Sequence, residues 1–192
     1  MITDINTHLL ERGLDISKYQ AHMCQETVCA TFWLFNLSSN IVGYQTYRPN
    51  SEKGRRSGER ASLMKYYNFV SKPCASRDAQ IAVWGLETVH LHDNIMFLTE
   101  GIFDAVKLHA LGLPAIAVLC NNPKHLKSWI KGMSKTTIAV CDNDSAGKKL
   151  ASIANYAIFP NDDNDLGDMT EEEAKKLLLS DGKVSELLKG RI

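Results

Sequence analysis

The chain has 192 residues, of which 44% are hydrophobic and 23% charged. These fractions are typical of globular domains and exclude a disordered chain, a collagen-like chain and a coiled coil. The 22 Lys and Arg residues equal the 22 Asp and Glu residues, so the net charge does not indicate a partner.

The sequence favours a cytoplasmic protein without a membrane partner. No run approaches the roughly 20 apolar residues that a membrane span needs. The N-terminus contains acidic residues and no apolar segment, so we expect no secretory leader. The five cysteines include no C-x-x-C pair, which predicts a reduced protein without a disulfide framework.

The first half of the chain predicts a short helix at residues 5–12 and a β-hairpin within residues 29–47. The hairpin consists of two β-rich runs on either side of residues 36–40, whose Asn and Ser residues favour a turn. Residues 48–65 contain six Lys or Arg residues against two Glu residues. We expect this basic segment to be a mobile loop.

The second half of the chain alternates between apolar runs and helical patterns. The expected strands lie at residues 95–100, 115–119 and 136–141. The expected helices lie at residues 103–112, 123–132 and 145–154. Strands that are apolar on both faces and separated by single helices indicate a parallel α/β sheet.

Carboxylates follow two of the three predicted strands. Glu100 ends the first strand, and Asp142 and Asp144 follow the third. Ligands of open α/β sheets bind at the carboxyl ends of the strands, and Mg²⁺ prefers a few carboxylates together with phosphate oxygens and water. Asp and Asn are also common turn residues, so spacing alone leaves a simple turn as an equally good interpretation.

The segments TEGIFDAVKLHALGLPAIAVL and IAVCDNDSAGKKLA together resemble the TOPRIM domain shared by topoisomerases and primases. That pattern has Glu followed by Gly, Asp four residues after the Glu, and then D-x-D-x-x-G after another strand. The matching residues are Glu100, Gly101, Asp104, Asp142, Asp144 and Gly147. The resemblance implies an α/β fold of the Rossmann-like TOPRIM type: a mainly parallel sheet with flanking helices, preceded by a small mixed α+β lobe with a β-hairpin.

The segments before and after this region resemble DnaG-type bacterial and phage primases, with phage primases the nearer match. IVGYQTYRP, KYYN and VWGLE occur in the order of that family, and FPNDDNDLGDMTEEE resembles its acidic D-x-x-D segment, here Asp165 and Asp168. The resemblance implies a basic lobe at residues 1–90 that binds template or nucleotide, a TOPRIM catalytic domain at 91–170 and a helical tail at 171–192. The location would then be the cytoplasm of a bacterium or of a phage-infected host.

The implied function is that of a metal-dependent nucleotidyltransferase, which synthesises or extends short RNA primers on single-stranded DNA. Its implied catalytic residues are Glu100, Asp142 and Asp144, and its implied ligands for Mg²⁺, or alternatively Mn²⁺, are Glu100, Asp104, Asp142, Asp144, Asp165 and Asp168. We expect the template and the ribonucleoside triphosphates to contact Arg48, Lys53, Arg55, Arg56 and Lys65, because basic side chains follow phosphates.

A zinc site is not expected, because His22, Cys24 and Cys29 lack the second ligand pair that a zinc ribbon needs. A replicative helicase or a separate zinc-ribbon protein is therefore a candidate partner. Two other functions remain open. A TOPRIM nuclease would share the acids but lack the KYYN and VWGLE elements. A non-catalytic module that binds single-stranded DNA or a helicase would not need so many unbalanced acids.

Overall fold

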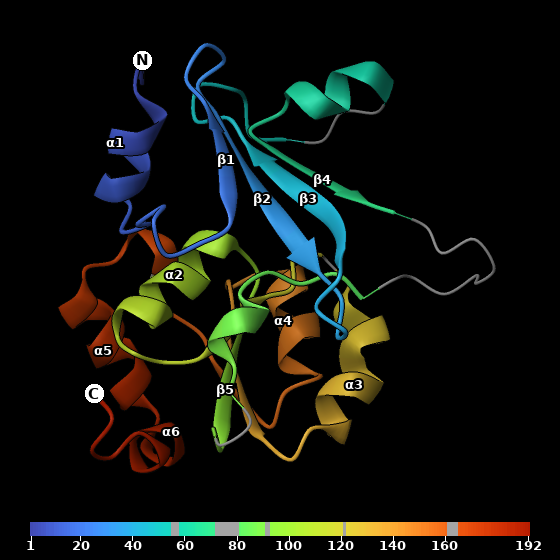
Figure 1. Cartoon of the computed structure of the whole chain (residues 1–192). Coiled ribbons are helices and arrows are strands. Elements are labelled where there is room, and N and C mark those ends of the chain that lie inside the picture. Colours follow the sequence, from blue (N-terminus) through green and yellow to red (C-terminus); the bar gives the residue numbers. More distant parts are fainter. Residues whose placement is uncertain (55–57, 72–80, 91–92, 121, 161–164) are drawn as a thin grey trace. The chain divides into compact units, whose positions relative to one another are not determined.

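The computed structural model describes residues 1–54, 58–71, 81–90, 93–120, 122–160 and 165–192. It divides into two compact units, Met1–Ala82 and Val83–Ile192 (Figure 1). Each unit contains its own sheet. The division at residues 90 and 170 that the sequence suggests, with a function for each part, stays a prediction.

The first unit contains a helix and an antiparallel sheet with the strand order β1-β2-β3-β4. The helix α1 (Ile5–Glu11) begins after Asp4, whose carboxylate caps it. The strands are β1 (Ala21–Cys24), β2 (Cys29–Phe35), β3 (Ile41–Tyr47) and β4 (Tyr66–Val70). The predicted hairpin is confirmed as β2 and β3, whereas β1 and β4 extend the sheet beyond the prediction. Part of the segment expected to be a loop forms the 3₁₀ helix η1 (Gly58–Leu63).

The sheet of the first unit has one face that is covered by α1. Ala30, Phe32 and Leu34 alternate along β2 and are at most 1% exposed. Tyr47 is the register partner of Ala30, so its side chain projects from the same face. Its hydroxyl lies 2.8 Å from Nε2 of His8 on α1. The core of the first unit therefore lies between α1 and this face.

The second unit contains a parallel sheet with the strand order β6-β5-β7-β8. Its strands are β5 (Ile95–Thr99), β6 (Ala115–Ala117), β7 (Thr136–Val140) and β8 (Tyr156–Ile158). All residues of β5 are buried, as expected for a central strand that is covered on both faces. The three predicted strands are confirmed, and β8 is an additional one.

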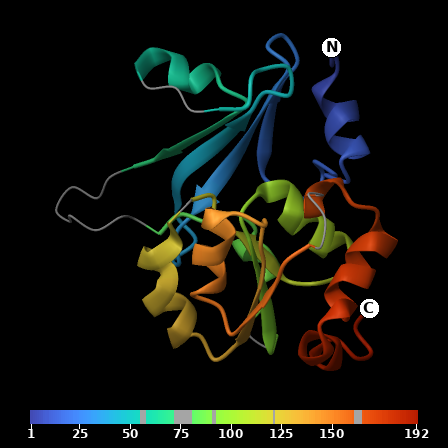
Figure 2. The same ribbon diagram turned by 180° about the vertical axis from the view of Figure 1, so that it is seen from behind.

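Helices cover both sides of this parallel sheet. They are α2 (Ile102–Ala110), α3 (Lys127–Gly132), α4 (Ser145–Ala151), α5 (Glu171–Ser180) and α6 (Gly182–Leu187), with the 3₁₀ helices η2 (Leu86–Thr88), η3 (Pro123–Leu126) and η4 (Leu166–Asp168). α2 and α5 lie on one side, and α3 and α4 lie on the other (Figures 1 and 2). The chain moves from β5 to β6 in one direction along the sheet and from β6 to β7 and β8 in the other direction. Because the crossovers between parallel strands are right-handed, the helices after this reversal lie on the opposite face. None of the helices in the described ranges is long and apolar enough to span a membrane.

Candidate active site

Carboxylates follow two adjacent strands at one edge of the parallel sheet. β5 and β7 pair with Leu98 opposite Ala139, so their carboxyl ends lie together. Glu100 is the first residue after β5, and Asp142 is the second residue after β7. The backbone N–H of Asp142 donates a hydrogen bond to Oε1 of Glu100, with an N···O distance of 3.3 Å. The fold therefore brings these two site residues of the sequence-based hypothesis together.

Asp144 has a structural function, because it caps α4; its predicted function as a metal ligand stays a prediction. Its Oδ1 accepts hydrogen bonds from the N–H groups of Ala146 and Gly147, at 2.7 and 2.9 Å. The glycine of the D-x-D-x-x-G pattern also has a steric reason. A Cβ atom on Gly147 would lie 2.0 Å from the carbonyl oxygen of Asp142. Only glycine lets α4 begin this close to Asp142.

Asp104 lies in the first turn of α2 and is 9% exposed. Both of its carboxylate oxygens accept hydrogen bonds from backbone N–H groups. Oδ2 accepts from Gly101 at 3.0 Å, and Oδ1 accepts from Gly167 at 2.9 Å, across 63 residues of sequence. Asp104 therefore connects the beginning of α2 to η4.

The two acids of the C-terminal segment flank η4. Asp165 caps this turn by accepting a hydrogen bond from the N–H of Gly167 at 3.1 Å, and it is also hydrogen-bonded to the side chain of Asp104. Asp168 is the last residue of η4 and is exposed. Asp165 is thus connected to the other acids by its hydrogen bond to Asp104. Asp168 lies at the C-terminal end of η4.

The carboxyl groups influence each other electrostatically. Burial and the negative charges of Asp142, Asp144 and Asp165 together raise the pKa of Glu100 to about 7, and burial has the largest effect. Burial also raises the pKa of Asp104 well above its ordinary value, together with the hydrogen bond to Asp165 and the charges of Asp165 and Asp142. We call Glu100, Asp104, Asp142, Asp144 and Asp165 the acid cluster. Such a cluster favours either a bound proton or a bound cation.

The comparison with protein families matches residues 97–165 to the family described as Toprim-like. This region of the chain resembles a TOPRIM domain. The match includes all five members of the acid cluster. The comparison with curated proteins gave no match.

Solved structures of primases have a similar fold. The E. coli primase catalytic core is 15% identical, with 91% of this chain and 70% of that chain covered and a TM-score of 0.63. The Aquifex aeolicus primase, with zinc-binding and RNA polymerase domains, is 14% identical over 96% of this chain and 59% of that one, with a TM-score of 0.64. A DnaG catalytic domain bound to single-stranded DNA is 15% identical over 94% and 60%, with a TM-score of 0.55. The chain therefore has the fold of a TOPRIM primase core and spans 59 to 70% of these three chains.

The donors of the acid cluster suit a hard divalent cation. All members of the acid cluster offer oxygen atoms, and Mg²⁺ usually binds through one or two carboxylates together with waters and substrate phosphates. Glu100 and Asp142 are the two members at the sheet edge. Among the described residues, no three or more His, Cys, Asp or Glu side chains form a group that could hold a metal ion by themselves. Glu100 and Asp142 therefore offer oxygen donors of the kind that Mg²⁺ uses together with waters and phosphates.

The basic residues of the sequence-based hypothesis lie in the first unit, before the Toprim-like region. Arg48 is partly exposed, and its Nη1 donates hydrogen bonds to the hydroxyl of Thr46 at 2.9 Å and the carbonyl of Ser62 at 2.7 Å. Arg48 therefore connects β3 to η1 in addition to any ligand contact.

Of the other four basic residues, the structure describes only the two lysines. Lys53 is exposed, and Lys65 is partly exposed. Arg55 and Arg56 lie outside the described residues.

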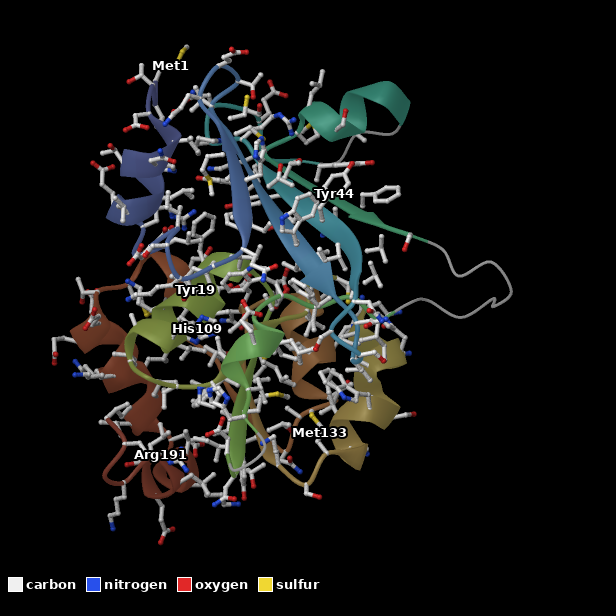
Figure 3. All side chains as sticks on the ribbon, in the orientation of Figure 1. Met1, Tyr19, Tyr44, His109, Met133 and Arg191 are labelled. Carbon is white, nitrogen blue, oxygen red and sulfur yellow. The ribbon has the colours of Figure 1, made fainter. Side chains whose placement is uncertain are left out.

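An aromatic row crosses the sheet face that is opposite the one covered by α1. Trp33, Tyr44 and Phe69 are register neighbours on β2, β3 and β4. The rings of Tyr44 and Phe69 stack with centroids 5.3 Å apart, and Trp33 and Tyr67 each lie 6.4 Å from Tyr44 (labelled in Figure 3). Phe69 is 45% exposed. Phe69 is not among the residues that the sequence-based hypothesis named, although its spacing of two from Tyr67 is the signal of a shared strand face.

Proposed function

We propose that this chain is a metal-dependent nucleotidyltransferase of the primase type, which synthesises or extends short RNA primers on single-stranded DNA. The observation that carries the proposal is the contact between Glu100 and Asp142 at the carboxyl ends of adjacent parallel strands. This is where α/β sheets bind their ligands. The negative charges of Asp144 and Asp165 also act on the carboxyl group of Glu100. This end of the sheet would therefore attract a cation that is bound to a triphosphate.

Glu100 and Asp142 are the residues that would hold Mg²⁺ or Mn²⁺, with Asp144 and the acids of η4, Asp165 and Asp168, around them. When bound, the cation supplies charge stabilisation for the triphosphate and lowers the pKa of the attacking hydroxyl. Asp144 also fixes the position of Asp142, because it caps the helix that packs against the carbonyl of Asp142.

We infer a positioning function for Asp104 in place of the metal contact that the resemblance implies. Its two oxygens already accept hydrogen bonds from Gly101 and Gly167. Burial and the neighbouring Asp165 raise its pKa and so favour its protonated form, which is a poor ligand. Asp104 thereby holds the turn after Glu100 and the turn that carries Asp165.

The first unit would bind the single-stranded template and the incoming ribonucleoside triphosphates. Aromatic rows of this kind stack with bases, and basic side chains follow the phosphates. The aromatic row of Trp33, Tyr44, Tyr67 and Phe69, together with Lys53 and Lys65, provides both groups. The similar DnaG catalytic domain that was solved with single-stranded DNA supports this partner. A helicase or a separate zinc-ribbon protein would complete the reaction by delivering template.

The test is a primer assay with the full chain, single-stranded DNA and labelled ribonucleotides, with and without a short RNA primer and with Mg²⁺ or EDTA. We expect metal-dependent elongation by the wild type and loss of at least about 100-fold in rate for Asp142→Asn, because positioned metal and charge stabilisation contribute at this scale. Asp181→Asn is the matched control, because Asp181 is an exposed Asp that caps α6.

The same gel separates the alternatives. Shortened DNA or RNA without elongated product would identify a nuclease and refute primer synthesis. DNA binding without either product in any divalent metal would identify a non-catalytic module. Full activity of Asp142→Asn would refute the proposed site.

A further inference from the structure

Two cysteines face each other across the hairpin formed by β1 and β2. Cys24 is the last residue of β1, Cys29 is the first residue of β2, and the two are register partners. Directly opposite residues of an antiparallel pair project from the same face, with Cβ atoms about 4.5–5.5 Å apart. A disulfide needs Cβ atoms about 3.5–4.5 Å apart. A small approach of the two side chains is therefore sufficient for a bond.

The two thiols have different environments. The sulfur of Cys24 accepts hydrogen bonds from the hydroxyl and the N–H of Thr27 and from the N–H of Glu26, which lower the pKa of this thiol. Cys24 is partly exposed, whereas Cys29 is 5% exposed. Burial raises the pKa of Cys29, and the neighbouring Cys24 adds to this effect. An accessible thiol with a lowered pKa beside a second thiol is the arrangement of a redox-sensitive cysteine and its resolving partner.

We propose that Cys24 and Cys29 form a reversible cross-strand disulfide when the chain meets hydrogen peroxide. The Cys24 thiolate attacks one peroxide oxygen, the S–O bond forms, the O–O bond breaks, and hydroxide leaves and takes up a proton as water. The Cys29 sulfur then attacks the sulfenic sulfur, the S–S bond forms, and the S–O bond breaks. The second hydroxide takes the Cys29 proton and leaves as water. The two sulfurs lose two electrons, and the peroxide gains them.

The disulfide would act on the loop that holds the N-terminal end of α1. The side chain of Gln25 accepts a hydrogen bond from the N–H of Ile5 at 3.1 Å and donates one to Asp4 at 2.6 Å. A bond between Cys24 and Cys29 joins the two ends of this loop. Oxidation therefore restrains the segment against which α1 begins.

The test is peptide mapping of the full chain after treatment with hydrogen peroxide and alkylation of the remaining thiols. Trypsin leaves both cysteines in one peptide, because no Lys or Arg lies between them, and cleavage after Glu26 then separates them. We expect two peptides that stay linked until dithiothreitol is added, with neither cysteine alkylated. The variant Cys29→Ala should stop at a sulfenic acid on Cys24 that dimedone traps. Cys24→Ser should leave Cys29 as a free thiol. Cys120→Ser, which removes a partly buried thiol with a raised pKa, should behave like the wild type.

Each other outcome would overturn the proposal. These outcomes are alkylation of both thiols after peroxide, oxidation of Cys24 to the sulfinic acid with Cys29 free, and a link from either cysteine to a different one. The mapping is made on the wild-type chain, so it does not depend on the folding of any variant. It also does not depend on nucleotidyl transfer, because it measures a covalent bond in the first unit.

Discussion

Gly147 packs against the backbone of Asp142 so closely that a Cβ atom would lie 2.0 Å from the Asp142 carbonyl oxygen. This contact sets the distance between the beginning of α4 and the end of β7. It therefore positions the acid at the sheet edge through the backbone, without a side chain.

Gly147→Ala should destabilise the second unit and reduce metal-dependent activity. The added methyl group meets backbone atoms that cannot move independently, so we expect a loss of about 3 kcal/mol in unfolding free energy, at the upper end of overpacking costs. Urea denaturation measures this loss. Gly182→Ala is the control, because Gly182 lies at the beginning of α6 with no atom within 4 Å of an added Cβ. It should be neutral or stabilise by about 0.5–1 kcal/mol. Equal effects of both variants would contradict the steric explanation.

The raised pKa of Glu100 predicts a pH-dependent stability in metal-free buffer. The folded state holds the proton up to about pH 7, whereas the ordinary value is 4.5. The stability that this proton provides is complete below pH 4.5 and is lost as the pH rises through 7. Glu100→Gln stays neutral, so it should flatten this loss and be more stable than the wild type at higher pH. Denaturation with EDTA between the two values measures the slope. Glu186→Gln, at an exposed position, should keep the wild-type slope.

His109 predicts a pH dependence of the opposite sign. The side chain of His109 is labelled in Figure 3. Its Nε2 lies 2.9 Å from the carbonyl of Ala115 and 3.2 Å from the hydroxyl of Thr88, and its ring stacks on Trp84. Burial lowers its pKa below 6.5, so the unfolded state takes up the proton first as the pH falls. The stability from the neutral ring is complete above pH 6.5 and declines below it.

His109→Gln should therefore flatten the decline in unfolding free energy just below pH 6.5. The exposed His125 provides the control variant His125→Gln, which should retain the wild-type curve. A wild-type curve for His109→Gln would show that this side chain does not titrate on unfolding.

The salt dependence of binding to single-stranded DNA should report on the lysines of the first unit. If Lys53 and Lys65 contact phosphates, Lys53→Ala/Lys65→Ala should weaken binding and reduce the log–log salt slope by about 1.4, or about 0.7 for each contact. Lys183→Ala/Lys189→Ala removes two exposed charges near the C-terminal helix α6 and should leave the slope unchanged. Fluorescence anisotropy across a salt series measures both. Equal slopes would place the DNA elsewhere.

De novo priming by this chain alone should be weaker than extension of a supplied RNA primer. Priming has to order a template and two nucleotides together, whereas a primer duplex is already ordered. His22, Cys24 and Cys29 do not make up a four-ligand zinc ribbon that could hold the template. Adding a zinc-ribbon protein or helicase from the same replication system should raise the yield of new primers by raising the local template concentration. Efficient initiation without a partner would contradict this expectation.

The sequence by itself determined the two central strands of each sheet and the edge strand β6. The apolar runs at β5, β6 and β7 and the alternating pattern at β2 and β3 are local signals, because buried strands need apolar residues at fixed spacings. It also located Glu100 and Asp142, since a parallel sheet places the ends of adjacent strands at one edge.

Only the tertiary structure decided the features that depend on distant segments. Three of the five residues of β4 are exposed, and β8 has only three residues. Their local sequence signals are therefore weak, and each segment forms a strand because a neighbouring strand supplies its hydrogen bonds. The resemblance implies that Asp104 is a metal ligand, which stays a prediction, and only the structure shows that its Oδ1 accepts a hydrogen bond from Gly167, 63 residues away. The opposition of Cys24 and Cys29 depends on the register of β1 against β2. Such pairings arise from the packing of the folded chain, and the local pattern of residue types does not contain them.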